Sequence, residues 1–154
     1  MANPFPFVAA SILTAAELNG IGASTASYTP TSTGVTIGNG TLTGNFGRIN
    51  KLIYGSVKLA LGSTTAITGI VTFSLPVTAA TNSAGLLMGN GYYYDNSSGE
   101  TYVGTSFRTN ATTLTPFVTY AAFAYAVRSL INATTPVVYA AGDEITYEFM
   151  YEAA

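Results

Sequence analysis

Apolar and polar residues alternate along two neighbouring stretches of the chain, 41–48 and 53–61. A period of two is typical of a β-strand with one buried face, so each stretch is predicted to be a strand. Between them lies Ile49-Asn50-Lys51-Leu52, which fits a two-residue turn because Asn50 tolerates positive φ. The stretch 38–59 is therefore predicted to form a β-hairpin. The residues expected to share one face of its two strands are Leu42, Gly44, Phe46 and Arg48, and then Ile53, Gly55, Val57, Leu59 and Leu61.

The rest of the chain shows further short strands, separated by clusters of turn-forming residues. Two of them, 86–94 and 101–107, flank the five-residue loop Asp95–Gly99 and are expected to form a second hairpin. About eight short strands with regularly spaced turns predict an all-β fold, a jelly-roll-like antiparallel β-sandwich over residues 28–154. The run 121–126 is also compatible with a helix. The other expected strands cover residues 34–37, 70–75, 114–120, 122–130 and 144–152.

Residues 1–27 differ in composition from the rest of the chain and are predicted to form an N-terminal docking arm. Pro4 and Pro6 favour an extended path. Thr14-Ala15-Ala16-Glu17 has the form of a capping box and Asn19-Gly20 that of a helix stop, so a short helical turn is expected there. Exposed apolar residues in such an arm are a liability, which favours docking on a partner or symmetry mate over packing on its own domain. The residues expected to dock are Phe5, Phe7, Ile12, Leu13 and Leu18.

The composition restricts the chemistry that the chain can perform. It contains no Cys, His or Trp, so catalytic sites based on His or Cys and the usual zinc sites cannot be built. Asp95 and Glu100 are expected to cap their loop or face solvent, and Asp143 to serve turn hydrogen bonding. We therefore expect no enzyme activity, no metal site and no cofactor.

Charge and hydropathy restrict the partners. Charged residues make up 8% of the chain, which leaves two interpretations: a neutral surface rich in hydroxyl groups, or a surface buried against other chains. The net charge of −2, without any run of Lys or Arg, argues against nucleic-acid binding. No apolar run approaches the roughly 20 residues that span a membrane, and the first residues lack the features of a signal peptide. The chain is expected to be made and kept in the cytoplasm, or released by lysis.

The most suggestive functional feature is the triplet Tyr92, Tyr93 and Tyr94. Alternation places Tyr92 and Tyr94 on one face of a strand and Tyr93 on the other. Exposed rings near Asn and Ser residues could stack on sugars. The favoured alternative is that the rings fill the core or a subunit interface, because Tyr combines an apolar body with a polar tip.

Several segments in a fixed order resemble a known module. They are Tyr28-Thr29-Pro30-Thr31, Gly38-Asn39-Gly40-Thr41-Leu42-Thr43-Gly44, Phe46, Ile49-Asn50-Lys51, Phe73-Ser74-Leu75-Pro76-Val77, the loop Asp95–Gly99 with Tyr102, Ala141-Gly142-Asp143-Glu144-Ile145 and Tyr151-Glu152-Ala153-Ala154. This order is similar to a recurrent module of tailed-bacteriophage virion proteins, found as the C-terminal domain of tail-fibre and minor structural proteins. Leu13 to Asn19 looks like the short helical segment that often precedes it.

The resemblance implies a virion protein, usually trimeric, with a jelly-roll-like fold. Almost nothing precedes the module in this chain, which favours a small accessory protein on the particle over a long tail fibre. The resulting prediction is a non-enzymatic capsid decoration or cement protein, located in the virion after synthesis in the host cytoplasm. Its expected partners are its own copies in a homotrimer and the major capsid protein or another virion protein. The alternative is an adhesin at a tail or fibre tip that binds a host surface glycan, and a more distant one is a bacterial lectin-like domain.

Overall fold

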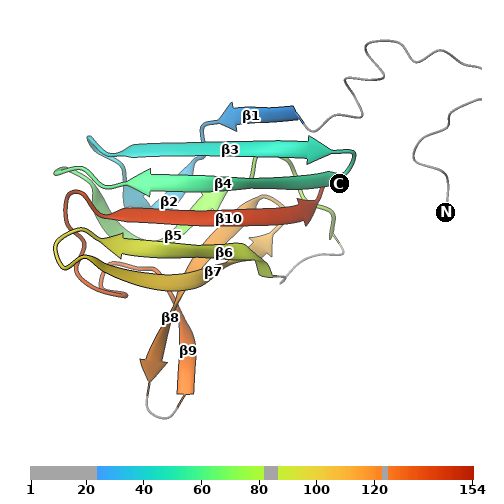
Figure 1. Ribbon diagram of the computed structural model, residues 1–154. Helices are drawn as coiled ribbons and strands as arrows, with labels where there is room; N and C mark the ends of the chain where they lie inside the picture. The colour runs from blue at the N-terminus through green and yellow to red at the C-terminus, as the bar shows by residue number, and fades with distance from the viewer. Residues whose placement is uncertain (1–23, 82–86, 123–124) are drawn as a thin grey trace, which may run out of the picture.

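The computed structural model describes residues 24–81, 87–122 and 125–154, which form an all-β fold (Figure 1). Neighbouring strands are antiparallel and follow the order β1-β3-β4-β10-β6-β7-β8-β5-β2, with β9 beside β8. They therefore make one continuous sheet. The strands are β1 (Ser24–Tyr28), β2 (Ser32–Thr36), β3 (Thr41–Ile49), β4 (Leu52–Ala60), β5 (Ala66–Ser74), β6 (Leu87–Asp95), β7 (Glu100–Asn110), β8 (Thr113–Ala122), β9 (Tyr125–Leu130) and β10 (Glu144–Glu152).

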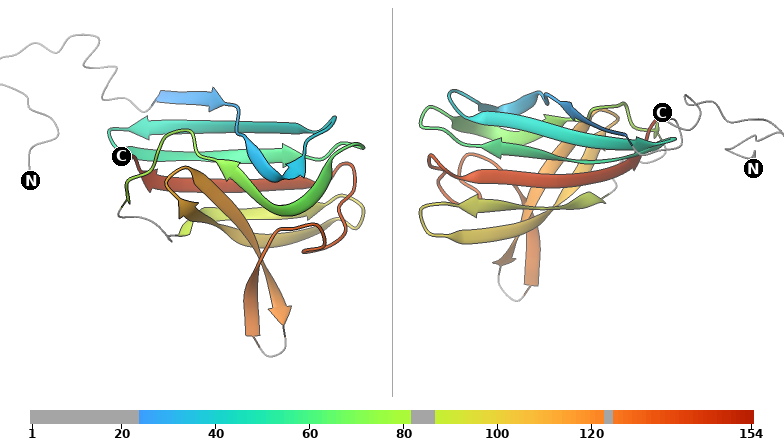
Figure 2. Two further views of the ribbon diagram at one scale, coloured as in Figure 1. Left: turned by 180° about the vertical axis from the view of Figure 1, so that it is seen from behind. Right: turned by 45° about the horizontal axis from the view of Figure 1, so that its top comes forward.

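The sheet curls so that its two ends face each other (Figure 2). Strands β1, β3, β4, β10, β6 and β7 form one layer, and β8, β5 and β2 cross behind it. The core lies between the two layers. Strand β10 contributes Ile145, Tyr147 and Phe149 to it, and β5 contributes Val71 and Phe73 from the opposite side, all at most 2% exposed. The predicted all-β antiparallel fold is confirmed, whereas the predicted helical turn and the docking residues lie outside the described residues.

The predicted hairpin at 38–59 is confirmed, and it lies in the layer that also contains β10. Strands β3 and β4 pair from Thr41 with Ala60 to Ile49 with Leu52, which leaves a two-residue turn. Asn50 has a φ of 54°, as that turn requires. The other edge of β4 pairs with β10 along its whole length, so this hairpin supports the last strand of the chain.

Strand β1 was not predicted. It lies at one edge of the sheet beside β3 and begins at Ser24, within the range assigned to the arm. Its sequence is polar, so it carries little of the alternation that identifies a half-buried strand. Its one large side chain, Tyr28, lies across Gly44, where an added Cβ would be 2.3 Å from the Tyr28 ring. The strand is held by this contact and by its backbone ladder.

Strands β8 and β9 form a hairpin that projects from the body of the molecule (Figures 1 and 2). From Thr119 onward β8 pairs only with β9, and Ala121 lies opposite Ala126. Strand structure, rather than the alternative helix, is therefore present on both sides of this turn.

Candidate ligand-binding groove

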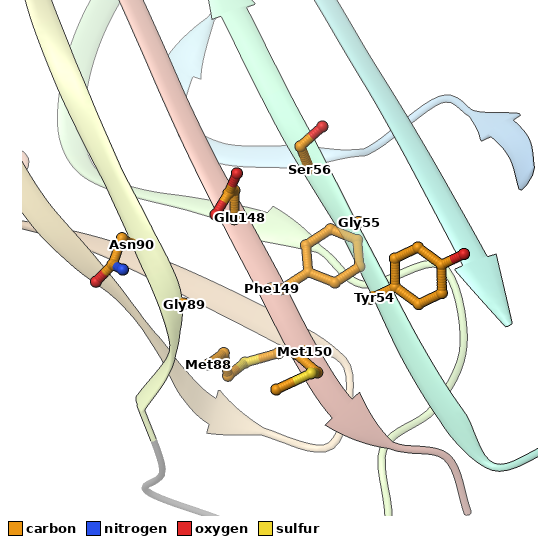
Figure 3. A pocket seen from close by; sticks show the side chains of 9 residues that line it. All are labelled: Tyr54, Gly55, Ser56, Met88, Gly89, Asn90, Glu148, Phe149 and Met150. Atoms are coloured by element: carbon orange, nitrogen blue, oxygen red, sulfur yellow. The ribbon is translucent and has the colours of Figure 1, made fainter. Parts of the chain in front are cut away.

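A groove opens on the outer face of the sheet where β6 separates from β10. The ladder between these strands pairs only residues 91–94 with 144–147. Beyond it β10 stays paired with β4 as far as Glu152, whereas β6 changes register between Leu87 and Gly89. A hollow of about 440 Å³ results across β4, β10 and β6 (Figure 3). Its lining residues are Tyr54, Gly55, Ser56, Met88, Gly89, Asn90, Glu148, Phe149 and Met150.

The first carbonyl oxygen beyond the β6–β10 ladder has a hydrogen-bond donor on another strand. The Glu148 carbonyl oxygen accepts a hydrogen bond of 2.6 Å from the Ser106 hydroxyl, which reaches across from β7. Gly89 leaves room for this approach, because a Cβ there would lie 2.6 Å from the same carbonyl oxygen. The Glu148 carbonyl oxygen is thereby satisfied, while the side chain of Glu148 is exposed on the outer face and has no hydrogen-bond partner among the described residues.

Aromatic rings form one wall and the floor of the hollow. The Tyr54 ring lies across Gly47 of β3, where an added Cβ would be 2.3 Å from the ring. Strand glycines in general accept such rings from a neighbouring strand, and the contact here holds Tyr54 flat on the sheet. Beneath it the Phe149 ring crosses Gly55 at 2.8 Å from the position of a Cβ. Met88 and Met150 lie at one end of the hollow, and Ser56 and Glu148 at the other (Figure 3).

A second hollow of about 250 Å³ adjoins the first, and the two share Asn90 and Glu148. Tyr92 and Val103 lie directly opposite each other in the β6–β7 ladder and are 37% and 64% exposed. The Thr146 hydroxyl oxygen is buried and has no hydrogen-bond partner among the described residues. The full lining is Asn90, Gly91, Tyr92, Thr101, Val103, Thr146 and Glu148.

The groove carries a negative charge and no positive one. Within the described part of the chain the one ion pair joins Lys58 Nζ to Glu144 Oε1 at 2.7 Å, on the same outer face. Glu148 is not part of it, and neither hollow is lined by Lys or Arg. An anionic ligand would meet the Glu148 carboxylate without any compensating charge.

The three tyrosines singled out in the sequence are divided between the two faces. Tyr92 and Tyr94 lie on the outer face; Tyr92 lines the second of the two hollows and Tyr94 lines neither. Tyr93 is fully buried and donates a hydrogen bond of 2.5 Å to Asp143 Oδ2. Burial, and next the hydrogen bond to Asp143, raise the Tyr93 pKa well above its usual value. Tyr93 therefore belongs to the core and cannot contact a ligand on the outer face.

The acidic loop residues serve the turns, as their positions predicted. Buried Asp143 also accepts hydrogen bonds from the backbone N–H groups of Asn96 at 3.0 Å and Ala140 at 2.7 Å. Asp95 accepts from the Ser97 hydroxyl and the N–H groups of Ser97 and Ser98. The side-chain and backbone hydrogen bonds of these serines lower the Asp95 pKa. Among the described residues no group of three acidic residues could hold a metal ion.

Sequence reasoning missed the residues that make the first hollow. Tyr54, Glu148 and Met150 fall on the polar face of their strands in the alternation, where a Tyr and a Met are unusual. That mismatch was the signal that could have found Tyr54 and Met150, whereas Glu148 gave no such signal. Asn90 gave none, because its position depends on where the β6–β10 ladder ends.

Comparisons of the chain with known protein families, curated proteins and solved structures found no match. Within the described residues no helix is long and apolar enough to cross a membrane.

Proposed function

We propose that this chain is a non-enzymatic structural protein of a bacteriophage virion, a capsid decoration or cement protein that packs as a trimer. One observation carries the proposal: the described surface exposes large apolar side chains while only 8% of the whole chain is charged. Surfaces of this kind are typical of proteins that bury them against other chains. Among the described residues, the large apolar side chains with the highest exposure are Val138 at 82%, Val103 at 64%, Leu87 at 63% and Met150 at 60%.

The finer description of the fold belongs to the same proposal. A jelly-roll-like β-sandwich is consistent with a curled sheet whose two ends enclose one core. The phage resemblance noted in the sequence is the second support for the assignment to a virion.

Sedimentation equilibrium of the full chain over a range of concentrations tests the assembly part of the proposal. A trimer is expected, and a monomer at every concentration would contradict it. Deletion of residues 1–12 tests the docking arm: the truncated chain should fold, by circular dichroism, and no longer bind phage particles that lack the protein. Undiminished binding of the truncated chain would remove the arm from the mechanism.

The alternative function, an adhesin at a tail or fibre tip, is favoured by a different observation. The two adjoining hollows on the outer face offer exposed aromatic and hydrogen-bonding side chains to a ligand. An adhesin should lose adsorption to host cells when the groove is altered, while its oligomeric state remains the same.

A further inference from the structure

We propose that the two hollows form a single site for a neutral glycan, with one sugar unit in each. The inference deepens the adhesin alternative. It rests on that alternative only because it requires a ligand to bind on the outer face. It does not depend on capsid decoration or on the trimer.

The hollows are suited in size and connection to a short chain of linked units. Their volumes are about 440 and 250 Å³, close to the roughly 300–1,000 Å³ range of small-molecule sites. Asn90 and Glu148 line both, so a ligand spanning the groove would pass their side chains at its middle. Two linked rings with a polar junction match this arrangement.

The lining matches the two kinds of surface that a sugar presents. A pyranose has an apolar face, and Tyr54 offers a ring held flat by its contact with Gly47. In the second hollow Tyr92 and Val103 offer the corresponding apolar surface. Sugar hydroxyl groups need donors and acceptors, and two exposed side chains supply them without partners of their own among the described residues: the Asn90 amide and the Glu148 carboxylate.

The charge of the groove selects among glycans. Glu148 accepts hydrogen bonds from hydroxyl groups but repels carboxylates, sulfates and phosphates, and no cation lines either hollow. The groove also disfavours an added peptide strand, because the carbonyl oxygen of Glu148 is already bonded to Ser106. A neutral glycan is therefore the occupant that the side chains favour.

Methionine methyl groups give a direct test of location. The chain has three methionines, and two of them, Met88 and Met150, line the first hollow. The full chain would be labelled at the methionine methyl carbons, and the Met88→Leu and Met150→Leu variants would assign the two groove signals. Titration with maltotriose, cellotriose, mannotriose and chitotriose at millimolar concentration should move both groove signals with at least one of these probes. Sialyllactose, the anionic comparison, should move neither.

Substitutions then distinguish residues of the groove from other residues of the outer face. Tyr54→Ala and Glu148→Gln should each weaken binding of the active probe by about tenfold. Tyr94→Ala is the matched control, because Tyr94 lies on the same face and lines neither hollow; it should change affinity by less than about twofold. Glu148→Gln alters an exposed side chain, so it remains informative even if Tyr54→Ala disturbs folding.

The proposal is overturned if no neutral probe moves the Met88 and Met150 signals, if sialyllactose binds as well as the neutral probes, or if Glu148→Gln leaves the affinity unchanged. A failure of the adhesin function is distinguishable from these results. If the chain binds a glycan in the groove but phage particles that carry Glu148→Gln adsorb to host cells as before, the site is retained and the adhesin role is removed.

Discussion

Alternate residues of β10 lie on opposite faces of the sheet, and the two faces have different roles. The inner face carries Ile145, Tyr147, Phe149 and Tyr151, none of them more than 6% exposed. The outer face carries Glu144, Thr146, Glu148, Met150 and Glu152, of which Met150 is 60% exposed and Glu148 lines both hollows.

The two faces differ in whether their polar side chains have hydrogen-bond partners within the protein. Every inner hydroxyl of this strand has an acceptor: Tyr147 donates to the Phe117 carbonyl oxygen at 2.7 Å, and Tyr151 to that of Val77 at 2.7 Å. On the outer face Glu148 and Thr146 have no such partner among the described residues. Inner substitutions should therefore affect stability, and outer ones should affect binding with little change in stability.

The largest effect is expected from alkaline pH, which acts on the inner tyrosines. Burial raises the pKa of Tyr151 to about 12 and also raises the pKa values of Tyr28, Tyr93, Tyr139 and Tyr147. Unfolded tyrosine ionises near pH 10. The folded state favours the neutral form, so this stability is fully present below about pH 10 and is lost as the pH rises toward and beyond 12. Ionisation of these five tyrosines, followed by tyrosinate absorbance, should therefore coincide with unfolding followed by circular dichroism, above pH 10. Full ionisation near pH 10 in a folded chain would contradict the burial of these rings.

The next effect comes from removing a single inner ring. Phe149→Ala should lower the free energy of unfolding by about 3–5 kcal/mol, because it removes a ring that is 2% exposed and crosses Gly55. Met150→Ala, at the next position on the outer face, should cost less than about 1 kcal/mol. Urea denaturation of both variants measures the difference. Similar losses in the two would mean that the outer face of β10 is covered.

A smaller effect should come from filling the space between Gly55 and the Phe149 ring. Gly55→Ala places a Cβ 2.2 Å from the Asn45 carbonyl oxygen and 2.8 Å from the Phe149 ring, and should cost about 1–3 kcal/mol. Gly69→Ala is the control, since its Cβ would meet nothing closer than 3.6 Å. Thermal unfolding of the two variants compares them. Equal melting temperatures would show that the strands move apart at no cost.

The alternation of side chains explains how much of this arrangement could be predicted. It correctly placed the strands around the turn at Asn50 and correctly divided Tyr93 from Tyr92 and Tyr94. These features depend on neighbours in the sequence. β1 could not be predicted in the same way, because a polar edge strand carries no alternating pattern.

The groove could not be predicted because it depends on contacts between distant strands. It exists because the β6–β10 ladder stops after Tyr147 and because Ser106 of β7 satisfies the carbonyl oxygen that the ladder leaves free. Its floor and wall depend on two glycines, Gly55 and Gly47, that accept rings from other strands. A glycine in a strand indicates that another part of the chain approaches it closely, but the amino-acid sequence does not say which residue that is.

The smallest effect concerns two adjacent tyrosines on opposite faces of β6. Tyr93→Phe removes the hydroxyl that donates to buried Asp143, which keeps only its two backbone donors. We expect a loss of about 1–2 kcal/mol in the free energy of unfolding, because a buried acceptor is left partly unsatisfied. Tyr92→Phe removes a hydroxyl with no partner among the described residues, so its effect should stay within about 0.5 kcal/mol. Urea denaturation at neutral pH measures both. Equal losses would require a partner for the Tyr92 hydroxyl, whereas no loss in either would mean that water replaces the Tyr93 hydroxyl at Asp143.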